Sequence, residues 1–74
     1  MTKMMQFTVK DNPDQIIEIH LRKKSMLAFI LKDGKPIAGN LFYFSGDPQD
    51  VKIAPVPERE LRATRKVAEK LAKG

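Results

Sequence analysis

Hydrophobic and polar residues alternate along most of the first three quarters of the chain. The side chains of a strand point to its two faces in turn, so an alternating pattern predicts half-buried strands. In the first of them Met5, Phe7 and Val9 share one face. We expect four or five strands, and their approximate bounds are 4–10, 16–22, 26–32, 36–45 and 51–54.

Turn-forming residues separate these runs. The segments KDNPDQ and GDPQD are rich in Asn, Asp and Pro, which favour turns. Asp33 and Gly34 directly follow an apolar run and predict a tight hairpin between the third and fourth strands. Gly39 indicates a bulge or a close backbone approach, and Pro55 suits a strand end or a sheet edge.

The last quarter of the chain changes to a helical period. Pro57 suits a first helical position, and Glu58 and Glu60 complement the positive end of the helix dipole. The stripe expected to pack against the sheet consists of Leu61, Thr64, Val67, Ala68, Leu71 and Ala72. We therefore predict a single α+β domain over residues 1–74, with an antiparallel meander of four to five strands followed by one amphipathic helix at about 57–72.

One helix can cover only one face of such a sheet. We expect it to cover the face formed by Phe7, Ile17, Ile19, Leu27, Phe29 and Leu41. The other face would then carry Ile16, Met26, Ala28, Ile30, Phe42 and Phe44. Exposed apolar patches of this size are unusual on soluble monomers. Either the sheet curls into a small barrel, or this face meets a protein partner or a second copy of the chain, with Ile16, Met26, Ile30, Phe42 and Phe44 as interface residues.

Charge adds a second candidate surface. The chain has a formal net charge of +5 and a pI near 9.8, a balance that favours anionic partners. Basic residues recur at spacings of three and four along the helix and form one ridge, which consists of Arg59, Arg62, Lys66, Lys70 and Lys73. A second basic group follows the second strand and consists of Arg22, Lys23 and Lys24. The alternative is a solvated face with the ion pairs Glu58–Arg62, Arg65–Glu69 and Glu69–Lys73.

Catalytic and metal-binding residue types are scarce. The chain has no cysteine and a single histidine, His20, which we expect at the surface or in an interface. The sequence shows no nucleophile motif, no calcium loop and no glycine-rich phosphate cradle. We therefore expect no catalytic residues, no metal, no cofactor and no small-molecule substrate. The amino terminus lacks an apolar signal segment, which favours a cytoplasmic protein.

Two functional hypotheses follow from these surfaces. The first is a small, basic, non-enzymatic domain that contacts the backbone of DNA or RNA through the helix ridge, with Arg22, Lys23 and Lys24 as a further contribution. The alternative is a protein-interaction module, such as a small regulator or inhibitor, that uses the uncovered apolar face and forms a homodimer.

Overall fold

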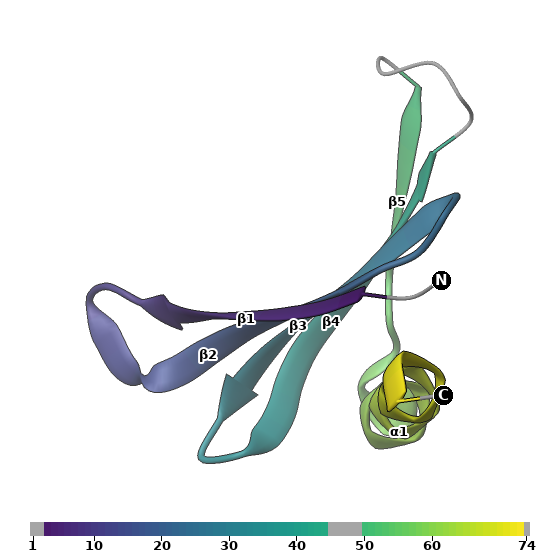
Figure 1. The fold of residues 1–74 in the computed structure, drawn as a ribbon. Coiled ribbons are helices and arrows are strands. Elements are labelled where there is room, and N and C mark those ends of the chain that lie inside the picture. Colours follow the sequence, from purple (N-terminus) through teal and green to yellow (C-terminus); the bar gives the residue numbers. More distant parts are fainter. Residues whose placement is uncertain (1–2, 45–49, 74) are drawn as a thin grey trace.

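A five-stranded antiparallel sheet carries one helix across one of its faces (Figure 1). The computed structural model of the chain describes residues 3–44 and 50–73. The strands follow one another in sheet order, β1 (Lys3–Val9), β2 (Asn12–Leu21), β3 (Ser25–Lys32), β4 (Lys35–Phe44) and β5 (Val51–Pro55). A short 3₁₀ turn, η1 (Glu58–Glu60), leads into helix α1 (Leu61–Lys73). The predicted α+β meander with one C-terminal helix is confirmed.

The strand bounds differ most from the prediction at the start of β2. This strand begins at Asn12 because the chain reverses at residues 10–11 and a register shift beside Val9 lets Asn12 pair with that residue. Asp33 and Gly34 have φ angles of 52° and 79°, the left-handed pair that a two-residue hairpin requires. The hairpin predicted there is confirmed, whereas most of the predicted turn GDPQD lies outside the described residues.

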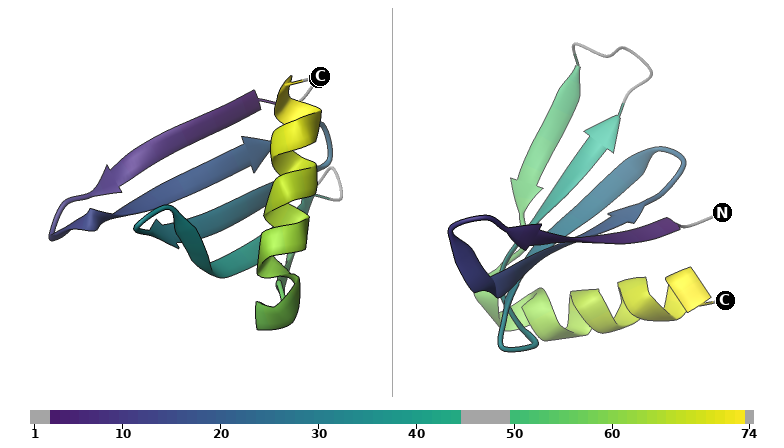
Figure 2. Two further views of the ribbon diagram at one scale, coloured as in Figure 1. Left: turned by 90° about the horizontal axis from the view of Figure 1, so that it is seen from below. Right: turned by 60° about the vertical axis from the view of Figure 1, so that its left-hand side comes forward.

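Helix α1 starts on the sheet because the chain before it is tied to β4. Val56 donates a backbone hydrogen bond of 2.9 Å to the carbonyl of Gly39. Pro57 then precedes η1, so the regular α-helix begins at Leu61 and not at the predicted first position. From there α1 runs across the strands toward β1 (Figure 2).

The core lies between β3 and the helix and is small. Five apolar residues of the described ranges are buried, namely Leu27, Phe29, Leu31, Leu61 and Ala68. Gly39 lies under this contact, where an added Cβ would stand 3.0 Å from Leu61 Cδ2 and 3.0 Å from Phe29 Cδ1. The glycine therefore permits a close approach of the Leu61 and Phe29 side chains, whereas the sequence predicted a close backbone approach or a bulge. The bulge in this hairpin lies nearby, where the register shifts between Ile30 and Leu31.

The prediction of which side chains face the helix was wrong for four residues. The ladder pairs Glu18 with Phe29, so the face of β2 that carries Glu18 and His20 is the one the helix covers. Ile16 shares this covered face, whereas Phe7, Ile17 and Ile19 lie on the opposite side. The sequence pattern assigned the apolar side of β2 to the core, but the register places its polar side there. We call the uncovered side the open face, and its central residues are Phe7, Ile17, Ile19, Met26, Ala28, Ile30, Phe42 and Phe44.

The packing stripe of the helix also differs from the prediction. Leu61 and Ala68 are buried as expected, but Val67 and Leu71 are 58% and 51% exposed. Arg65 is largely covered and faces the sheet, so the contact line passes through Leu61, Arg65 and Ala68. Val67 and Leu71 therefore lie on one flank of the helix, turned away from that line.

Replacement of Gly39 by valine should destabilise the fold, because the added methyl groups would press on the buried Phe29 ring and on Leu61. We expect a loss of about 1–3 kcal/mol in the free energy of unfolding, measured by urea denaturation. Ala38→Val on the open face of the same strand is the matched control and should change the midpoint little. Equal midpoints for both variants would contradict the close packing at Gly39.

Candidate functional site

A buried carboxylate joins the helix to the sheet. Glu18 is 1% exposed and accepts four hydrogen bonds. Arg65 donates two of them, from Nε to Oε1 at 3.0 Å and from Nη2 to Oε2 at 3.2 Å. Gln6 Nε2 donates to Oε2 at 2.9 Å, and His20 Nε2 lies 2.8 Å from Oε1. The carboxylate thus links β1, β2 and α1.

This cluster fills a structural role. A carboxylate has about four lone-pair sites, and protein donors occupy all of them at Glu18. Since an ionised carboxylate only accepts, the hydrogen between the two residues belongs to His20 Nε2. The His20 ring is fully buried and stands edge-on to Phe29 at 5.8 Å between centroids. The expectation of a surface or interface histidine was wrong, because the covered face of β2 is its polar one.

The environment of Glu18 favours its ionised form. Burial by itself raises the pKa of a carboxyl group, but the hydrogen bonds from Arg65, His20 and Gln6 outweigh it and lower the pKa of Glu18 from 4.5 to about 2. The hydrogen bond to Glu18 in turn raises the pKa of Arg65 above its ordinary value. Arg65 Nη2 also lies 2.8 Å from Glu69 Oε1, four residues further along the helix, so the predicted Arg65–Glu69 pair is present.

Because Arg65 turns inward, the helix presents other cations to solvent. Arg59, Arg62, Lys66 and Lys70 are exposed, and none forms an ion pair with another residue in the described ranges. The predicted Glu58–Arg62 pair is thus missing there. The side chain of Lys73 lies outside the described part of the structure.

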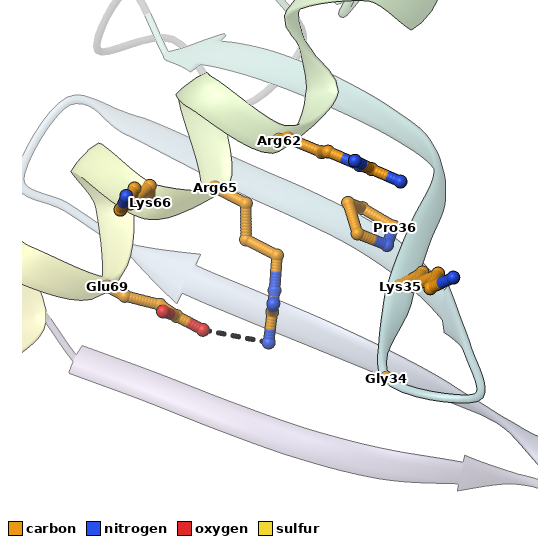
Figure 3. Close-up of a pocket in the computed structure, with 7 residues that line it drawn as sticks. All are labelled: Gly34, Lys35, Pro36, Arg62, Arg65, Lys66 and Glu69. Atoms are coloured by element: carbon orange, nitrogen blue, oxygen red, sulfur yellow. Dashed lines mark ion pairs between the residues drawn. The ribbon is translucent and has the colours of Figure 1, made fainter.

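The β3–β4 hairpin adds a further cation beside the helix. A pocket of about 240 Å³ separates the two elements (Figure 3), and its lining consists of Gly34, Lys35, Pro36, Arg62, Arg65, Lys66 and Glu69. Arg62 lies over Pro36 and extends toward the same side as Lys35. We call the set Lys35, Arg59, Arg62, Lys66 and Lys70 the basic surface. Sequence reasoning missed Lys35, and its position directly after the Asp33–Gly34 turn was the only signal.

The second predicted basic group lies elsewhere. Arg22 lines a groove of about 460 Å³ on the other flank of the helix, together with Leu27, Leu41 and Val67 among others. Its Nε is buried without a hydrogen-bond partner among the described residues, whereas Lys23 and Lys24 are exposed. Helix α1 separates this group from the basic surface (Figure 2), so the two do not form one continuous band.

The predicted interface residues divide between the two faces of the sheet. Met26, Ile30 and Phe42 lie on the open face in the ladders of β3, and Phe44 continues this face beside Val51 of β5. Ile30 is 37% exposed, and Ile53 of β5 extends the same face with 62% exposure. Ile16 packs against the core on the helix side and does not belong to this set.

The pKa of Glu18 predicts a pH dependence of stability. A carboxyl group with a pKa of 4.5 when unfolded and about 2 when folded stabilises the native state fully above pH 4.5. We expect the free energy of unfolding to fall as the pH drops from 4.5 toward 2, measured by urea denaturation at a series of pH values. Glu18→Gln should flatten this part of the profile, whereas Glu60→Gln, at an exposed carboxylate, should retain it. A profile for Glu18→Gln that parallels the wild type would contradict the assignment.

Other kinds of site find little support in the described part of the chain. No group of three or more His, Asp or Glu side chains within residues 3–44 and 50–73 is placed to hold a metal ion. No helix in those ranges is long and apolar enough to cross a membrane. In comparisons with known proteins, no family model, no curated protein and no solved structure matches this chain. The two surfaces of the molecule are therefore the features that bear on its function.

Proposed function

We propose that the protein is a small, non-enzymatic domain that binds the phosphate backbone of nucleic acid through the basic surface. The observation that carries the proposal is the set of exposed cations on α1 that form no ion pair within residues 3–44 and 50–73, while Arg65 and Glu69 on the same helix pair with one another. The nearby acid Glu58 lies beside Arg59 and Arg62 at the start of the helix without an ion pair to either among the described residues.

Like charges at this spacing destabilise a helix on its own. Arg62 and Lys66 stand four residues apart, as do Lys66 and Lys70, and each such pair costs a few tenths of a kcal/mol. A polyanion relieves this repulsion, and each cation that meets a phosphate releases a condensed counterion. Binding of an anionic partner therefore relieves the charge repulsion that destabilises the isolated helix.

The chemistry of the basic surface fits contact with phosphates and not the reading of bases. Its five members are all Lys or Arg, and none supplies an aromatic ring for base stacking. Contacts of this kind fix the position of a nucleic acid and are largely independent of its sequence. The proposal includes neither catalysis nor a cofactor, and it includes the cytoplasmic location expected from the sequence.

A salt titration of binding to mixed-sequence duplex DNA and to RNA tests the proposal. With four or five phosphate contacts, the logarithm of the binding constant for duplex DNA should fall with the logarithm of the salt concentration with a slope of about −4. Absence of binding at low salt, or binding without a salt slope, would refute nucleic-acid contact.

A matched pair of lysine substitutions locates the surface. Lys66→Met should weaken binding and reduce the magnitude of the salt slope by about 1, because one phosphate contact is lost. Lys24→Met removes the same charge on the other side of the helix and should leave the slope unchanged. Both lysines are exposed, so urea midpoints should match the wild type. An effect of Lys24→Met equal to that of Lys66→Met would mean that the contact lies elsewhere or that binding depends on net charge alone.

The predicted protein-interaction role is favoured by a separate observation, the open apolar face. The two roles do not compete for residues, because helix α1 with Arg62, Lys66 and Lys70 lies on the sheet face opposite the open face.

A further inference from the structure

The chain exposes more surface than a compact protein of its size. Its accessible surface is 5785 Å², whereas a folded monomer of this mass exposes about 4,600 Å². Its radius of gyration is 12.4 Å, against about 11.3 Å for a compact chain of this length. The excess of roughly 1,200 Å² is larger than the area of about 800 Å² that each partner buries in a stable interface.

Much of the exposed apolar surface lies on the open face. Phe7 is 49% exposed, Ile30 37% and Ile53 62%, and they belong to the first, third and fifth strands of the sheet. The central residues of this face include no charged side chain, and the nearest cations on that side lie at strand ends, namely Lys3, Lys32 and Lys35. The two longer dimensions of the molecule are 35 and 28 Å, so the sheet provides a face of the size an interface needs.

A second copy of the chain fits this face better than an anionic or strongly charged partner. The centre of the face is neutral, so two copies related by a two-fold axis bring no like charges together despite a net charge of +5 on each chain. Dimerisation would also compensate for the small number of buried apolar residues in one copy, because small domains commonly extend their cores by oligomerisation.

We infer that two copies pack their open faces together and form a sandwich with the helices on its two outer sides. This arrangement points the two basic surfaces away from one another, since each helix lies on the sheet face opposite the contact. A second step, which rests on the proposed function, is that one dimer engages two separate nucleic-acid segments and bridges them.

Sedimentation velocity of the protein alone tests the contact. The wild type should sediment as a dimer that dissociates only on dilution, and Ile30→Lys should be monomeric because it buries a charge in the centre of the contact. Val67→Lys is the matched control, since Val67 is 58% exposed on the helix side, and it should remain dimeric. Phe7→Lys, at a more exposed position of the open face, should also be monomeric and serves if Ile30→Lys does not fold. A wild type that is monomeric at all concentrations, or an Ile30→Lys variant that folds and stays dimeric, would overturn the inference.

Capture of one DNA duplex by another tests the bridging step. Wild type and Val67→Lys should retain a labelled duplex on beads that carry a second duplex, whereas Ile30→Lys should bind a single duplex and retain no second one. Dimers that bind one duplex without bridging would overturn the outward arrangement of the basic surfaces. Dimers that bind no nucleic acid would refute the proposed function and the bridging step but support the contact between open faces. Monomers that bind nucleic acid would support the proposed function but refute the contact between open faces and, with it, the bridging step.

Discussion

The hydrogen-bonded ion pair between Glu18 and Arg65 determines how the helix lies on the sheet. Glu18 stands on the covered face of β2, and the guanidinium of Arg65 reaches it with two hydrogen bonds of 3.0 and 3.2 Å. A buried charge without a partner costs several kcal/mol, so rotations of the helix that separate this pair are strongly disfavoured. The apolar contacts of Leu61 and Ala68 specify the rotation less sharply, because hydrophobic attraction is non-directional whereas a two-pronged arginine–carboxylate pair has a fixed geometry.

The rotation set by this pair has consequences on both flanks of the helix. With Arg65 turned inward, Arg62 and Lys66 face the β3–β4 hairpin and solvent, and the basic surface gains Lys35. Val67 and Leu71 are displaced to the other flank and remain half exposed. The polar cluster also occupies much of the covered face of β2, and Ile17 and Ile19 of that strand lie on the open face. The position of one buried carboxylate thus accounts for a charged surface on the helix side and an apolar surface on the opposite side of the sheet.

Sequence reasoning predicted the elements well because they depend on local signals. Alternation gave the strands, Asp33 and Gly34 gave the hairpin, and the change of period at Pro57 gave the helix. The faces could not be predicted in the same way, since they depend on which residues pair across strands. A pattern that places Ile17 and Ile19 on one side of β2 does not determine which side the helix covers. Apolar side chains usually face the core, but here the helix covers the polar side of β2. The exposed cations of α1 were predicted from spacing, but Lys35 joins them only through the tertiary fold.

A double-mutant cycle between Glu18 and Arg65 tests most directly whether this pair positions the helix. The free energies of unfolding of the wild type, Glu18→Gln, Arg65→Met and the double variant would be measured by urea denaturation at neutral pH. We expect a coupling of about 1.5–3 kcal/mol, because each single change leaves the other charged partner without its hydrogen bonds across the pair and the double change removes both. A coupling near zero, with the two losses simply additive, would contradict it and would mean that apolar packing alone holds the helix in place.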